Sequence, residues 1–84
     1  MRRDMSFVRG ILLAAEELPA KGGRIEPLPG RSDDELRYHL RIMSQAGLLD
    51  VRSGHEGAAY ETIWVNGLTW RGHDFLDAAR HESV

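Results

Sequence analysis

The sequence predicts one small α+β domain over residues 1–84, a winged helix-turn-helix-like fold with three helices and a β-hairpin in its C-terminal half. In three separate stretches, apolar residues recur at steps of three and four, which is the spacing of an amphipathic helix. Between the second and third of these stretches, two short segments alternate apolar and polar residues, as the strands of a hairpin do. A chain of 84 residues has room for a single hydrophobic core.

The first helix is expected to begin after Asp4, whose carboxylate can accept hydrogen bonds from the free backbone N–H groups of a helix start. Pro19, Gly22 and Gly23 then end it. Its core-facing residues are expected to be Met5, Val8, Ile11, Leu12, Ala15 and Leu18. Residues 21–30 contain two prolines and three glycines, so we expect a loop with at most a short edge strand at residues 24–26.

The second helix has the clearest start, because Ser32 and Glu35 have the spacing of a capping box. Its core-facing residues are predicted to be Leu36, Leu40 and Met43. Gly47 is placed to end the helix in the left-handed conformation.

The hairpin is predicted from a first strand that opens with Leu49 and Val51, a turn region at residues 52–59 and a second strand at residues 60–65. Asn66 and Gly67 form a typical turn dipeptide. Thr69 can then cap a third helix that runs to about Arg80. Its core-facing residues are predicted to be Gly72, Phe75, Leu76 and Ala79, with Trp70 packing at the helix entry.

The composition excludes several classes of function. The chain has no cysteine, which rules out a disulfide framework, a thiolate zinc site and a cysteine nucleophile. The longest uncharged apolar run, residues 10–15, is too short to cross a bilayer, so we expect a cytoplasmic protein without a membrane partner. No nucleophile elbow, phosphate-binding glycine loop or zinc-protease histidine pair is present, so we expect no catalytic site, no cofactor and no small-molecule substrate.

Histidines are the remaining candidates for metal binding or acid–base chemistry. On the third helix His73, Asp77 and His81 are spaced to lie on one face, but this is a weak metal pattern without a fourth ligand. We therefore predict no metal site. His39 lies beside the core-facing residues of the second helix, where a lone histidine is usually structural, and we interpret it so.

Nucleic-acid binding is one hypothesis for function. The second helix would be the recognition helix, presenting polar side chains to a major groove while the hairpin approaches phosphates. The residues concerned are Arg37, Tyr38, Arg41, Gln45, Arg52 and His55. Against this hypothesis stand a net charge of −2 and the acidic residues Asp33, Asp34 and Glu35 in the first turn, which would repel phosphate.

Three segments of the chain resemble the DUF2513 family, an uncharacterised family found in bacterial and prophage genomes. They are residues 1–13 (MRRDMSFVRGILL), 38–49 (YHLRIMSQAGLL) and 68–80 (LTWRGHDFLDAAR). The resemblance implies a layout similar to winged helix-turn-helix proteins more than it implies a function. It also implies that His73, beside Trp70, packs and hydrogen-bonds at the base of the hairpin. The chain departs from the usual DNA-binding winged helix between Leu18 and Ser32, where little room remains for a further helix.

Two functions therefore stay open, a DNA-binding regulator with duplex DNA as partner and a protein-binding module without DNA binding. The protein partner would be a second copy of the chain in a homodimer or a host protein bound by a phage-encoded factor. An exposed tryptophan would favour the second hypothesis, because tryptophan is a strong interface anchor. Trp64 and Trp70 are the two candidates, although their spacing is more typical of core residues.

Overall fold

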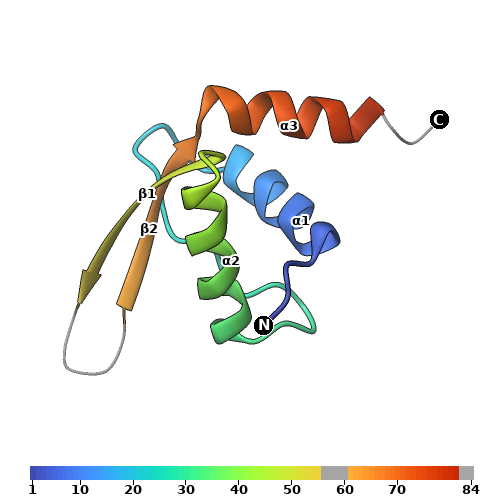
Figure 1. The fold of residues 1–84 in the computed structure, drawn as a ribbon. Coiled ribbons are helices and arrows are strands. Elements are labelled where there is room, and N and C mark those ends of the chain that lie inside the picture. Colours follow the sequence, from blue (N-terminus) through green and yellow to red (C-terminus); the bar gives the residue numbers. More distant parts are fainter. Residues whose placement is uncertain (56–60, 82–84) are drawn as a thin grey trace.

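The computed structural model describes residues 1–55 and 61–81. In this part of the chain three helices and one antiparallel hairpin follow each other in the predicted order (Figure 1). The elements are α1 (Met5–Glu16), α2 (Asp33–Gln45), β1 (Leu49–His55), β2 (Glu61–Leu68) and α3 (Trp70–His81). The α+β class is confirmed, and the layout is compatible with a winged-helix-like domain.

Helix α1 begins where the sequence predicts. The Asp4 carboxylate accepts hydrogen bonds from the N–H groups of Ser6 (3.0 Å) and Phe7 (3.3 Å). Phe7 takes the buried place that we expected for Met5, whose side chain is 46% exposed. The other buried residues of the helix are Val8, Ile11, Leu12 and Ala15, as predicted.

Helix α2 has both of its predicted ends. Both halves of the capping box between Ser32 and Glu35 are present. At the other end Gly47 has a φ of 78°, and the Leu48 N–H donates to the Met43 carbonyl at 2.9 Å. This Schellman motif folds Leu48 back into the core. Leu36, Leu40 and Met43 are buried as predicted.

The hairpin is longer than predicted. Strand β1 continues to His55 because its residues pair in register with β2 as far as Glu61. The turn predicted at Asn66 and Gly67 is wrong, since both residues belong to β2. Asp50 pairs with Gly67 and Val51 with Val65, so Asn66 is one extra residue opposite β1, as in a β-bulge.

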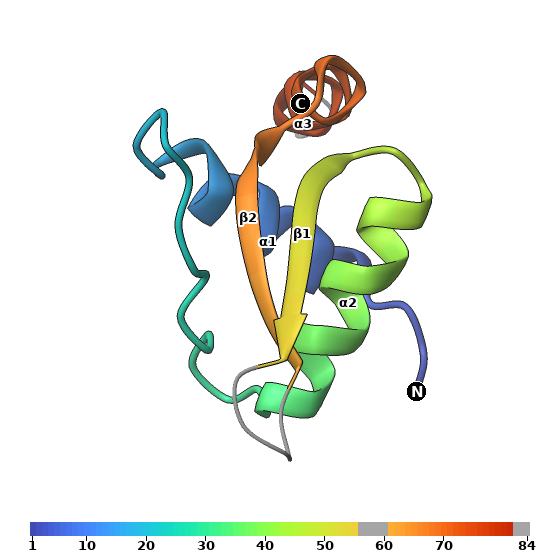
Figure 2. The ribbon, with the colours of Figure 1, turned by 90° about the vertical axis from the view of Figure 1, so that its left-hand side faces the viewer.

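The linker between α1 and α2 contains no helix, as expected. It runs along β2 on the side away from β1 (Figure 2). Gly23 forms a single antiparallel bridge with Val65, with hydrogen bonds of 2.9 and 2.8 Å, and the neighbouring Ile25 is buried. A third edge segment thus takes the place where a winged helix normally has its bracing helix.

Helix α3 lies across one end of the rest of the fold (Figure 1). The Thr69 hydroxyl accepts a hydrogen bond from the Gly72 N–H at 3.0 Å, which confirms the predicted cap. Gly72 and Leu76 are buried, and Arg80 forms an ion pair with Glu16 of α1. Trp70 does not pack at the helix entry. It is 85% exposed, because it lies on the side of the helix opposite to Gly72 and Leu76.

Candidate functional site

The outward face of α2 carries the residues predicted for DNA recognition. Arg41 and Gln45 are exposed, and Arg37 and Tyr38 are half-buried. Residues 37, 41 and 45 follow each other at i+4 steps, so they lie in one row along the helix. Arg37 is in an ion pair with Asp34, so an acidic side chain belongs to the same surface.

The hairpin residues predicted to approach phosphates form a different cluster. Arg52 pairs across the hairpin with Trp64, and its guanidinium lies 5.4 Å from the centre of the Trp64 ring. Trp64 is half-buried, and its indole N–H donates to the Lys21 carbonyl at 3.4 Å. The His55 backbone pairs with Glu61, but the His55 side chain lies outside the described part of the structure.

The histidines of α3 do not form a site in the part that the structure describes. His73 is exposed, so the expectation that it packs at the base of the hairpin is wrong. Asp77 is also exposed, and its carboxylate lies 3.7 Å from the guanidinium of Arg80. The side chain of His81 is outside the described part of the structure. Among the described residues, no group of three or more His, Cys, Asp or Glu side chains is arranged to hold a metal ion.

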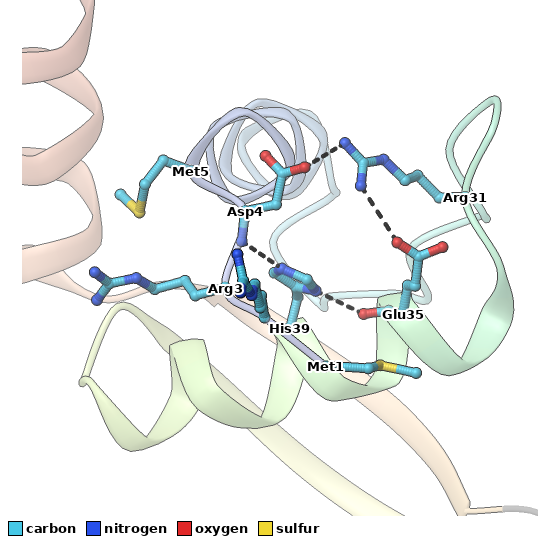
Figure 3. A pocket seen from close by; sticks show the side chains of 8 residues that line it. Met1, Arg3, Asp4, Met5, Arg31, Glu35 and His39 are labelled. Carbon is cyan, nitrogen blue, oxygen red and sulfur yellow. Dashed lines mark hydrogen bonds and ion pairs between the residues drawn. The ribbon is translucent and has the colours of Figure 1, made fainter.

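A hollow of about 590 Å³, lined mainly by charged residues, lies where the chain start meets α2 (Figure 3). It is lined by Met1, Arg2, Arg3, Asp4, Met5, Arg31, Glu35 and His39. Arg31 binds the carboxylate of Asp4 at 2.6 Å and that of Glu35 at 3.3 Å. The hydrogen bond from the Arg31 guanidinium lowers the pKa of the Asp4 carboxyl. The pKa of the Glu35 carboxyl is lowered mainly by the hydrogen bond from the Ser32 backbone N–H, and also by the hydrogen bond from Arg31.

His39 forms the buried wall of this hollow and is 1% exposed. Its Nε2 accepts a hydrogen bond from the Asp4 N–H at 3.0 Å, so the proton of the neutral ring is on Nδ1. Nδ1 donates to the Glu35 carbonyl at 2.8 Å. The imidazole also packs against Phe7, with 4.7 Å between the centres of the two rings. Arg31 joins the carboxylates of Asp4 and Glu35, and the His39 ring bonds the backbone of the same two residues, so these four residues act as a clamp between α1 and α2.

A second depression, of about 330 Å³, is mainly apolar and lies between α1, α2 and α3. We call it the α3 groove; its lining residues are Arg3, Met5, Val8, Ile42, Met43, Ala46, Leu48, Arg71 and Phe75. Met5 leaves much of its side chain open to solvent, and Phe75 is half-buried. The groove thus offers apolar surface flanked by two guanidinium groups.

The exposed Trp70 directly precedes Arg71, which lines this groove. Trp70 and Asp74 form one i, i+4 row on α3, and Arg71 and Phe75 form the adjacent row. We call these four residues the α3 face. Sequence reasoning missed the groove, because three separated segments of the chain supply its lining. An exposed tryptophan was one of the features expected to mark an interface.

The matching family model covers residues 2–84 and is described as "Hypothetical protein (DUF2513)". The chain belongs to the DUF2513 family.

A curated relative supports the same assignment. The chain is 28% identical over 86 residues to an uncharacterised protein of Haemophilus influenzae (strain ATCC 51907 / DSM 11121 / KW20 / Rd), a match that covers 100% of this chain and 72% of that protein. No solved structure gives a significant match. Neither the family description nor the name of the relative indicates an enzyme. Of the helices in the described part of this DUF2513 chain, none has the length and apolar character needed to span a membrane.

Proposed function

We propose that this DUF2513 domain is a non-catalytic module that binds another protein through the α3 groove and the adjacent Trp70. The observation that carries the proposal is that Trp70 is 85% exposed on the helix whose next residue, Arg71, lines a mainly apolar groove. A tryptophan in water leaves a large apolar area uncovered, and such residues dominate the energetics of protein interfaces.

The charges of the groove define the chemistry of its partner. Arg3 and Arg71 line the groove, and within the described residues neither guanidinium is in an ion pair. A partner segment that brings an aromatic or aliphatic side chain together with carboxylates would therefore match both the apolar floor and the two cations.

A labelled synthetic peptide can test this proposal. The probe is an amphipathic helix with tryptophan, leucine and glutamate on one face, and the control peptide has lysine in place of glutamate. We expect the acidic peptide to bind and the basic one not to bind, because the second would meet like charges at Arg3 and Arg71. Ala46→Glu puts a carboxylate in the groove and should weaken binding of the acidic peptide by at least about tenfold.

Gln45→Glu is the matched control, since it adds the same charge at the neighbouring exposed residue, which does not line the groove. Its affinity should stay within about twofold of the unsubstituted protein in fluorescence anisotropy, since an exposed charge away from the contact contributes little. Equal affinities of both variants for the peptide, or no peptide binding at concentrations at which the chain is a monomer, would contradict the proposal.

Duplex DNA is a second candidate partner, favoured by the row of Arg37, Arg41 and Gln45 on the helix that precedes the hairpin. The exposed carboxylates of Asp33 and Asp34 weigh against it. If DNA binds there, Arg41→Ala should weaken binding and reduce the slope of log affinity against log salt by about 1. Lys21→Ala, on the linker, is the control. Electrophoretic mobility shift at low and physiological salt is the measurement, and no shift at low salt rejects this candidate.

A further inference from the structure

We infer that the partner of the α3 groove is a second copy of this chain, and that the two α3 helices pack antiparallel about a two-fold axis between Gly72 and His73. The inference rests on the proposed function, because it names the protein that the groove binds. Two observations carry it, namely the arrangement of charges on the α3 face and the apolar groove beside it.

The α3 face is free to meet a partner because the core contacts of the helix lie elsewhere. Gly72 and Leu76 are buried against the domain, whereas Trp70, Arg71 and Asp74 are exposed. Figure 1 shows α3 at the edge of the molecule, with the rest of the fold on one side of it. A second helix can therefore lie along this face without displacing a core residue.

The register follows from the two rows of the α3 face. In an antiparallel pair centred between residues 72 and 73, Arg71 lies opposite Asp74 of the second copy, and Trp70 lies opposite Phe75 of the second copy. The two-fold axis repeats each contact, so one patch is complementary to itself, as an isologous interface requires. Phe75 also lines the α3 groove, so the incoming indole has an apolar depression to fill.

The charges favour this register. Arg71 and Asp74 have opposite charges, and in the part of the chain that the structure describes neither takes part in an ion pair. Both face solvent in the monomer, so pairing them across the axis costs less desolvation than burying an isolated charge. The small size of the domain points the same way, because a core built from 84 residues leaves a thin stability margin that a dimer can increase.

Complementary charge reversal is the experiment that tests the pairing. In a homodimer of the Arg71→Asp variant, the aspartate at position 71 of one copy would face Asp74 of the other copy. In a homodimer of the Asp74→Arg variant, Arg71 of one copy would face the arginine at position 74 of the other copy, so both homodimers bring like charges together. Each variant alone should dimerise at least about tenfold more weakly than the unsubstituted chain. In a mixture of the two variants every facing pair is again opposite in charge, so a heterodimer should form. Sedimentation equilibrium over a range of concentrations, with one variant carrying a fluorescent label, measures this.

Trp70→Ala provides an independent variant, which should weaken the dimer at least about tenfold because it removes the apolar anchor. Circular dichroism checks that each variant is folded. A dimer that resists these substitutions, or a mixture that forms no heterodimer, overturns the inference. A folded monomer at the highest concentration also overturns it, and the acidic peptide then separates two cases. If the peptide binds this monomer, the proposed function stands with another partner; if it does not bind, both proposals fail.

Discussion

Replacement of Gly72 by alanine is expected to lower the free energy of unfolding by about 3 kcal/mol or more, since forced overpacking against fixed atoms is among the costliest single changes. A Cβ atom at this position would lie 2.1 Å from the Leu48 carbonyl oxygen and 3.1 Å from its carbon. This carbonyl cannot easily move. It accepts the Thr69 N–H at 3.1 Å, and Leu48 is itself held by the bond from its N–H to the Met43 carbonyl. Helix α3 would have to move away from the core to make room.

Gly10→Ala in α1 is the matched control, because it adds the same methyl group to another glycine inside a helix. There the Cβ would meet only the Leu28 Cδ1 atom at 3.2 Å, the end of a half-buried side chain that can shift. The better helix propensity of alanine, about 1 kcal/mol, should offset that contact and leave the stability within about 1 kcal/mol of the unsubstituted protein. Urea denaturation followed by circular dichroism compares the two variants, and equal midpoints would show that close packing of α3 on Leu48 is not needed.

Local sequence patterns predicted the helices well, because their ends depend on neighbouring residues. Asp4, Ser32 and Thr69 each cap the helix that follows them, and Gly47 ends α2 in the left-handed conformation. These contacts span only a few residues along the chain, so the sequence contains all the information that they need.

Positions that depend on contacts between distant segments were predicted less well. Asn66 and Gly67 are typical turn residues, yet pairing with β1 makes them part of a strand with an extra residue. Trp70 was expected to pack at the helix entry, but the contact between Gly72 and Leu48 sets the rotation of α3 and leaves the indole in solvent. The orientation of a helix on a core is a tertiary property that its own periodicity does not determine.

In the candidate sites too, features that depend on neighbouring residues could be predicted, and features that depend on contacts between distant segments could not. The row on α2 followed from i+4 spacing, but the ion pair between Arg37 and Asp34 depends on side-chain conformations that a spacing does not define. The α3 groove could not be predicted, because Met5, Ile42 and Phe75 meet only in the folded chain. The proposal of a protein partner therefore rests on surface geometry and not on any sequence motif.

Substitution of His39 by leucine is expected to destabilise the protein by about 2–3 kcal/mol, the cost of leaving buried polar groups without partners. Leucine has a similar size and keeps an apolar contact with Phe7, but it cannot accept the Asp4 N–H or donate to the Glu35 carbonyl. The Asp4 N–H matters most, because that residue both caps α1 and binds Arg31. Loss of the hydrogen bond from the Asp4 N–H should therefore loosen the start of α1 as well as lower the global stability.

His39→Gln separates the hydrogen bond from the packing. The amide oxygen of glutamine can take the place of Nε2 and accept the Asp4 N–H, so this variant should lose about half as much stability as the leucine variant. Amide hydrogen exchange measured by NMR gives a local test, since the Asp4 amide should exchange faster in the leucine variant than in the glutamine variant. If the leucine variant is as stable as the unsubstituted protein, or if the Asp4 amide exchanges equally in both variants, then the imidazole acts as packing alone and the clamp between α1 and α2 depends on Arg31.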